Sequence, residues 1–339
     1  MAAGYAAALA AGGVLFAYTK AFFTSPLHRE DPHALPVGEQ YISERERMLA
    51  LIEELEQIPF EPVTIRSRDG LKLYGRYYHV REGAPVQIQV HGYRGSALRD
   101  FCGGSKLARE MGMNILLVDQ RAHGGSGGRT ITFGIRERWD CLSWAEYAAE
   151  RFGDVDIYLV GVSMGAASVL MASELDLPEN VAGIIADCPF SSSEAIIAKV
   201  CREDLHLPQP LAMAFVYAAA AMPGGFDLRA ASAVEAVSRT HIPVLLIHGE
   251  DDKFVPCGMS REIYAACQSR KTLETFPGAG HGLSYIVDEA RYAEAVEKFV
   301  KECSASAAGR RERQTNLKGA CLWVRARQVR KVGYIYRYR

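Results

Sequence analysis

The sequence lacks an excess of charge of either sign. Its 339 residues carry 39 Lys and Arg against 40 Asp and Glu, which gives a formal net charge of −1. A nucleic-acid-binding protein usually shows an excess of basic residues, and a disordered chain holds fewer apolar residues than the 49% found here. The composition therefore excludes a general nucleic-acid binder and predicts a folded chain with ample length for a core.

Closely spaced metal ligands and cysteine pairs are also missing. The eight cysteines form no CxxC pair, and the nine histidines show no HExxH spacing. Zinc modules and disulfide scaffolds depend on such patterns, so we expect reduced, buried thiols, no bound metal and no cofactor. The glycine-rich segment at 124–128 is not followed by Lys-Ser/Thr, which predicts a loop rather than a phosphate site.

The first 19 residues carry no charged side chain, and Lys20 is the first one in the sequence. About 20 apolar residues suffice to cross a bilayer as a helix, and no basic residue precedes the segment as a signal peptide requires. We predict a single membrane anchor over residues 1–24, with a helix packed on the domain, a poorly ordered leader or a cleaved signal as alternatives. Lys20 and Arg29 follow the segment and favour a cytoplasmic location for the remaining chain; a cytoplasmic protein without an anchor is the alternative.

The middle of the chain differs from both ends. From residue 304 onward ten basic residues accompany a single acid, Glu312, and we interpret 304–339 as a basic, disordered tail. Residues 25–59 are expected to form a linker and helical lead-in. One folded domain is therefore predicted over residues 60–303.

Within this domain short apolar runs alternate with stretches of helical character. Runs at 63–66 and 71–80, separated by Asp69-Gly70, predict an antiparallel hairpin. Later runs begin at residues 86, 114, 157, 183 and 244. Strands that are apolar throughout, separated by helices, predict an α/β fold with a mostly parallel central sheet and helices on both faces.

The strongest chemical signal is the G-x-S-x-G motif Gly161-Val162-Ser163-Met164-Gly165, which lies between a strand run and a helical run. In that context the serine occupies a tight turn at the N-terminus of a helix, where its hydroxyl is exposed as a nucleophile. A serine nucleophile needs a base, and the base needs an orienting acid. We predict His281 as the base and Asp252 as the acid, with Asp251 and Asp187 as alternative acids.

A second motif, His91-Gly92-Tyr93-Arg94-Gly95, follows the strand that ends at Val90. The backbone N–H groups of Tyr93 and of Met164, the residue after the serine, are predicted to form an oxyanion hole. His91 is interpreted as a structural residue rather than as a second base.

The alternation is interrupted by an insertion at residues 189–241, which is far longer than a crossover helix requires. We predict a short helical lid over the ligand site, with extra scaffold helices as the alternative. The apolar stretch at 211–222 predicts a pocket for short-to-medium acyl chains, with Phe215 and Met213 as candidates for its floor.

From about residue 60 to 303 the chain resembles the α/β-hydrolase superfamily, and within it the bacterial membrane-anchored or cytoplasmic serine hydrolases. Besides the two motifs above, the resemblance rests on residues 118–124 with Ser126, 131–134 with Glu137 and Asp140, 187–190, 248–256 and 280–282. In that family the acid occupies the third position after the His-Gly pair, which is Asp252 here. The resemblance implies the α/β-hydrolase fold and hydrolysis, and says little about the substrate.

These features predict a serine hydrolase that cleaves small-molecule carboxylic esters through an acyl-enzyme intermediate, in class EC 3.1.1. Peptidase or amidase activity (EC 3.4) or thioesterase activity with the same residues is the alternative among hydrolases. The alternative of another class is a non-catalytic, lid-gated binding protein or a membrane-tethered interaction protein.

Overall fold

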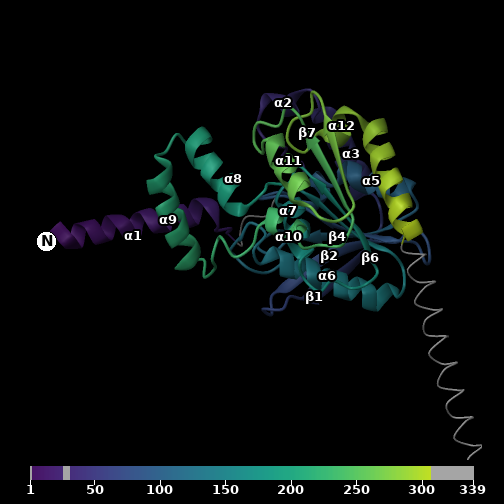
Figure 1. Cartoon of the computed structure of the whole chain (residues 1–339), viewed down its shortest axis with the longest axis horizontal. Helices are drawn as coiled ribbons and strands as arrows, with labels where there is room; N and C mark the ends of the chain where they lie inside the picture. The colour runs from purple at the N-terminus through teal and green to yellow at the C-terminus, as the bar shows by residue number, and fades with distance from the viewer. Residues whose placement is uncertain (1, 26–30, 307–339) are drawn as a thin grey trace, which may run out of the picture.

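The computed structural model describes residues 2–25 and 31–306, and an eight-stranded sheet forms the centre of this part of the chain (Figure 1). The strand order is β1-β2-β4-β3-β5-β6-β7-β8. The strands are β1 Glu61–Arg66, β2 Lys72–Tyr78, β3 Val86–Val90, β4 Asn114–Asp119, β5 Ile157–Val162, β6 Val181–Asp187, β7 Val244–Gly249 and β8 Lys271–Phe276. β2 pairs antiparallel with β1 and β4, and the remaining pairs are parallel. The predicted hairpin and the predicted mostly parallel sheet are confirmed.

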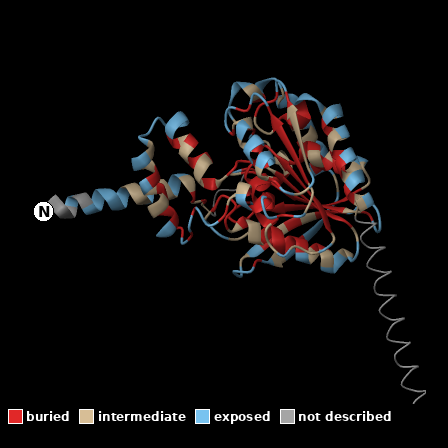
Figure 2. Cartoon of the chain, viewed as in Figure 1, coloured by how far each residue is buried: buried red, intermediate tan, exposed pale blue. Residues whose placement is uncertain are grey.

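Helices cover both faces of the sheet, as the sequence predicts for strands that are apolar throughout. One face packs against α3 Arg45–Glu56, α5 Cys102–Glu110, α12 Ser284–Val287 and a helix over residues 289–306. The other face packs against α6 Glu137–Phe152, α7 Met164–Ala172, α10 Ala233–Val237 and α11 Cys257–Ala266. The buried strands at the centre of the molecule show as a continuous block (Figure 2).

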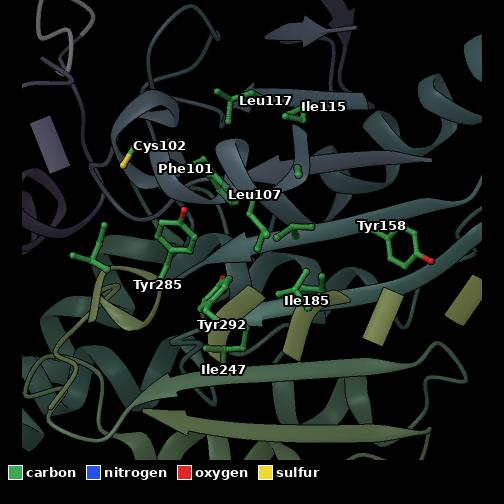
Figure 3. Close-up of a cluster of buried hydrophobic side chains, with 14 of the residues drawn as sticks. Phe101, Cys102, Leu107, Ile115, Leu117, Tyr158, Ile185, Ile247, Tyr285 and Tyr292 are labelled. Carbon is green, nitrogen blue, oxygen red and sulfur yellow. The ribbon is translucent and has the colours of Figure 1, made fainter. Parts of the chain in front are cut away.

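Side chains of the strands β4, β5, β6 and β7 alternate between two separate cores. In β5, Tyr158 joins the core beneath α5 and the helix at 289–306, whereas Leu159 joins the core beneath α6 and α7. Figure 3 shows the first of these cores, where Ile185 and Ile247 from the sheet lie near Tyr292. Because both faces are buried, the register of each strand is strongly specified.

A third group of helices stands away from the sheet (Figure 1). Between β6 and β7 the chain forms α8 Ser193–Lys199, a π-helical turn Val200–Asp204 and α9 Gln209–Ala221 before it returns to the sheet at α10. The N-terminal helix α1, Ala2–Ala21, packs against α9. We refer to α1, α8, the π-helical turn and α9 together as the cap.

Within the described residues, none of the helices has both the length and the apolar character that crossing a membrane requires. The structure therefore does not support the anchor predicted over residues 1–24. The C-terminal half of α1 is partly buried in the cap instead, and Phe22, directly after the helix, is fully buried. Most of the predicted basic tail lies outside the described residues.

Candidate active site

Ser163 lies at the sharp turn between β5 and α7. Its backbone angles are φ 56° and ψ −115°, and its N–H donates a 2.8 Å hydrogen bond to the carbonyl oxygen of Asp187. A Cβ at Gly161 would lie 2.4 Å from the backbone of Gly165, and a Cβ at Gly165 would lie 1.9 Å from the carbonyl oxygen of Val90. The two glycines of the motif are therefore a steric requirement of this turn.

The structure brings Ser163, His281 and Asp252 into one line of hydrogen bonds. Nδ1 of His281 donates to Oδ2 of Asp252 at 2.7 Å, and Nε2 lies 2.9 Å from Oγ of Ser163. With the proton on Nδ1, the unprotonated Nε2 can accept the hydroxyl proton of the serine. The three side chains come from loops that follow β5, β7 and β8, so the carboxyl ends of parallel strands gather them at one edge of the sheet.

Asp252 is held by more than its bond to His281. Its Oδ1 accepts hydrogen bonds from the backbone N–H groups of Phe254 at 2.9 Å and Val255 at 2.8 Å. Burial by itself would raise the pKa of Asp252, but hydrogen bonds from His248 and His281 outweigh it and hold that pKa well below its ordinary value. The carboxylate therefore stays ionised and acceptor-only.

His248 is a contributor to the site that the sequence reasoning missed. Its ring is fully buried, with Nδ1 2.6 Å from the Ser260 hydroxyl and Nε2 2.8 Å from the carbonyl oxygen of Val255. The same Nε2 lies 3.3 Å from Oδ2 of Asp252. The sequence could have indicated this role, because His248 lies at the end of β7 and only four residues before Asp252. A residue at the end of a buried strand can contact the loop that follows the strand.

The two alternative acids occupy different environments. The side chain of Asp251 is exposed, whereas Asp187 at the end of β6 is buried. Burial raises the pKa of Asp187 to about 6, and Tyr292 donates a hydrogen bond to its carboxyl group. Its Oδ1 has no hydrogen-bond partner among the described residues. Of the three candidate acids, Asp252 is the one that lies against the imidazole of His281.

The loop that carries His281 is fixed from the N-terminal lead-in. The helix α2, Glu39–Ile42, contributes Tyr41, whose hydroxyl donates to the carbonyl oxygen of His281 at 2.9 Å. The side-chain oxygen of Gln40 accepts the His281 N–H at 3.4 Å. The segment expected to be a linker and helical lead-in thus also positions the imidazole.

The predicted oxyanion loop after β3 lies beside the serine. A Cβ at Gly92 would lie 3.3 Å from the serine Cβ. The N–H of Gly92 donates to Oδ2 of Asp100 at 2.8 Å, and the N–H of Arg94 donates to Nε2 of His123 at 3.1 Å. These two bonds fix the backbone on either side of Tyr93.

Met164 and His91 complete the surroundings of this loop. Met164 is the first residue of α7, so its N–H has no acceptor within the helix. His91 is fully buried; its Nδ1 lies 2.8 Å from the carbonyl oxygen of Gly92, and its Nε2 accepts the N–H of Gln120 at 3.0 Å. Both ring nitrogens are used to hold the loop, in agreement with a structural role.

Two cavities meet at Ser163, each of about 490 Å³. The first, which we call the inner cavity, extends from His281 past Arg99 and Tyr41 towards Asp187 and Tyr292. The second, the cap cavity, lies between α1 and the α8–α9 segment, and Lys20 is the one charged residue among those that line it. Phe215 lines the cap cavity, whereas Met213 is buried elsewhere in the cap, so the structure separates the two candidates for a pocket floor.

Among the described residues, one group of potential metal ligands is closely spaced. Sγ of Cys188, a carboxylate oxygen of Asp252 and a ring nitrogen of His281 all lie within 4.8 Å of one another. Burial raises the pKa of the Cys188 thiol well above its ordinary value, so the sulfur stays protonated and is a poor metal ligand. The carboxylate of Asp252 and the imidazole of His281 are hydrogen-bonded to each other, which engages two of the atoms that could ligate a metal.

A comparison with protein families agrees with the sheet and with the turn at Ser163 described above. Residues 90–295 match the model of the alpha/beta hydrolase family. The chain belongs to the alpha/beta hydrolase family. The match includes the serine turn, the oxyanion loop and the loops that carry Asp252 and His281.

Several relatives of this alpha/beta hydrolase share most of its length. "Uncharacterized protein YqkD" of Bacillus subtilis is 27% identical over 263 residues, which cover 76% of this chain and 84% of the relative. The "Lysophosphatidylserine lipase ABHD12" of Danio rerio is 26% identical over 220 residues, covering 60% of this chain and 51% of the relative.

Solved structures share the fold of this alpha/beta hydrolase. The esterase Pf2001 of Pyrococcus furiosus matches with a TM-score of 0.57 and 22% identity, covering 74% of this chain and 93% of its own. Est1E of Butyrivibrio proteoclasticus, solved with ferulic acid, matches with a TM-score of 0.54 and 22% identity, covering 72% of this chain and 99% of its own. The fold predicted from the sequence is confirmed.

Proposed function

We propose that this alpha/beta hydrolase is a serine esterase that uses Ser163 as nucleophile, His281 as general base and acid, and Asp252 as orienting acid. The observation that carries the proposal is a pair of hydrogen bonds: Nδ1 of His281 donates to Asp252 at 2.7 Å, and the hydroxyl of Ser163 donates to Nε2 of His281 at 2.9 Å. The distance between Ser163 and His281 is within the reach that proton transfer requires, and the distance between His281 and Asp252 is that of an orienting hydrogen bond.

In the first half of the reaction Oγ of Ser163 attacks the ester carbonyl carbon while Nε2 of His281 takes the hydroxyl proton. The imidazolium formed faces an ionised Asp252, which stabilises its charge without itself being protonated. Collapse of the tetrahedral intermediate breaks the carbon–oxygen bond to the alcohol. His281 returns its proton to that leaving oxygen, and the acyl group stays on the serine.

The negative charge of the tetrahedral intermediate falls on the former carbonyl oxygen. We assign its stabilisation to the backbone N–H groups of Tyr93 and Met164, which border Ser163 from the fixed loop after β3 and from the start of α7. Each such donor contributes about 3 kcal/mol to transition-state stabilisation. The positive end of the α7 dipole adds to this effect.

Water then cleaves the acyl-enzyme by the same route in reverse. His281 takes a proton from the water as its oxygen attacks the acyl carbonyl, and it returns that proton to Oγ of Ser163 as the serine leaves. The products are a carboxylic acid and an alcohol, and the protein regains its starting protonation state.

The cap cavity favours an acyl ester over a peptide. Its walls are carbon-rich, and a peptide backbone buried there would lose hydrogen bonds to water without replacement. Lysophosphatidylserine, named in the Danio rerio relative, is an ester with one acyl chain. Acyl thioesters and acyl amides could use the same residues and the same cavity, so the choice among them is made by the substrates that the enzyme turns over.

The proposal is tested by covalent labelling of the purified full-length chain with a fluorophosphonate and by turnover of p-nitrophenyl butyrate. We expect one stoichiometric adduct on the peptide that contains Ser163, and loss of turnover in proportion to labelling. A folded protein that neither labels nor turns over the ester would overturn the proposal and favour a non-catalytic binding protein. Labelling with turnover of amide but not of ester substrates would replace the esterase by an amidase.

A further inference from the structure

The N-terminal helix α1 forms one wall of the cap cavity. Its lining positions are Gly13, Phe16, Ala17, Lys20 and Ala21. With 3.6 residues per turn, positions 13, 16, 17, 20 and 21 share one face of a helix. The helix that the sequence suggested as a membrane anchor therefore presents one continuous stripe to a cavity that also reaches Ser163.

The C-terminal end of α1 is tied to the catalytic side of that cavity. The side chain of Arg94 donates to the carbonyl oxygens of Lys20 at 2.9 Å and of Phe23 at 3.2 Å. Phe22 packs its ring edge-on against Phe133 and Phe226. Because α1 rises about 1.5 Å per residue, Gly13 lies about 12 Å along the helix from Ala21.

α1 packs against α9, and Gly13 lies at a close contact between the two helices. A Cβ at Gly13 would lie 2.6 Å from the ring of Phe215, so glycine lets the ring pack directly on the backbone of α1. Gly12, one residue earlier, has no atom within 4 Å of such a Cβ. Both Gly13 and Phe215 line the cavity, and Gly13 is the lining residue of α1 most distant in sequence from the Ser163 end.

We propose that α1 is one side of the acyl-binding site and that the contact between Gly13 and Phe215 closes its far end and sets the acyl length. The inference rests on the proposed esterase function. Carbon–carbon bonds of about 1.5 Å advance an extended chain by about 1.3 Å each, so a 12 Å groove takes a single unbranched chain of about nine or ten carbons. The matching substrates are medium-chain acyl esters.

The test measures kcat/KM for p-nitrophenyl esters from two to sixteen acyl carbons on the full-length chain. For the wild type we expect up to about a fourfold gain per added carbon, to a maximum near eight to ten carbons, and a fall beyond it. Gly13→Leu adds a side chain at the end of the groove and should shift the maximum down by at least two carbons. Phe215→Ala removes the stop and should shift it up.

Two matched variants control for changes that do not reach the groove. Gly12→Leu makes the same substitution on the same helix where a Cβ meets no neighbour, and Met213→Ala truncates a buried residue of α9 that does not line the cavity. Both should keep the wild-type maximum. The double variant Gly13→Leu/Phe215→Ala should return towards it, because one change fills the space that the other creates.

The outcomes separate this inference from the proposed function. Absence of fluorophosphonate labelling and of acetate hydrolysis in the wild type would mean that the esterase proposal fails. An active wild type whose maximum stays unchanged in both Gly13→Leu and Phe215→Ala would overturn the role of α1 as the acyl wall. Should Gly13→Leu not fold, the direction of the shift in Phe215→Ala decides alone.

Discussion

The hydroxyl of Tyr93 donates a 2.9 Å hydrogen bond to the carbonyl oxygen of Ala21, the last residue of α1. Tyr93 thus joins two parts of the proposed site, since its own backbone N–H belongs to the oxyanion loop. A movement of α1 would therefore be transmitted to the loop to which we assign transition-state stabilisation. Together with the side chain of Arg94, which donates to the carbonyl oxygens of Lys20 and Phe23, Tyr93 connects the end of α1 to this loop.

Tyr93→Phe should lower kcat/KM about fivefold for every acyl length, because the lost hydrogen bond is worth about 1 kcal/mol and the loop loses a support. Steady-state kinetics with the acetate and octanoate esters measure the effect. Tyr18→Phe is the control: it removes another bond between α1 and the domain, at 2.8 Å to Thr130, without touching the oxyanion loop. Equal rates for the acetate ester in Tyr93→Phe and wild type would contradict the coupling.

Ser163→Ala should abolish ester hydrolysis and fluorophosphonate labelling while the fold is kept, because the small side chain suits the same buried turn. Removal of a serine nucleophile from such a constellation typically costs on the order of 10⁶-fold in turnover. Circular dichroism and thermal unfolding verify the fold, and turnover is measured at saturating ester. Residual activity of more than a few per cent in the purified variant would show that another residue is the nucleophile.

Asp252→Asn should reduce turnover about 10⁴-fold, since the amide cannot hold the imidazole in the required tautomer or stabilise its positive charge. Asp251→Asn should remain near the wild type, because that side chain is exposed and does not contact His281. The two variants differ by one position in the same loop and are compared under one assay. Similar losses in both would remove the basis for choosing Asp252.

Asp187→Asn should change how stability depends on pH. Burial raises the pKa of Asp187 from an ordinary 3.8 to about 6, so the folded state binds a proton more readily than the unfolded chain. The stability contributed by this group is fully present below pH 3.8 and is lost as pH rises through about 6.

In urea unfolding, the stability of Asp187→Asn relative to the wild type should therefore rise between pH 4 and pH 7, by at most about 3 kcal/mol. The exposed Asp251→Asn serves as the reference. A relative stability of Asp187→Asn that is flat or falls over this range would show that the carboxyl group is not destabilised by its burial.

Much of the site could be predicted from sequence because its determinants are local. The serine turn requires glycines at 161 and 165 whatever surrounds it, since their backbones approach within contact distance of neighbouring strands and helix. The strands β3 and β4 are buried on both faces and rich in Val, Ile and Leu, so their positions follow from composition and spacing. Parallel strands then place the loops after β5, β7 and β8 at one edge of the sheet, which is why Ser163, Asp252 and His281 were predictable as a set.

Only the tertiary structure distinguishes neighbouring residues of the same type and shows what an apolar segment packs against. Asp251 and Asp252 are the same residue type in one loop, and only the path of that loop turns one carboxylate towards the imidazole. From the sequence alone, the apolar stripe of α1 could be buried in lipid or against protein, because the hydrophobic effect is not directional. Its packing against α9, at the close approach of Gly13 and Phe215, makes it a wall of the cap cavity.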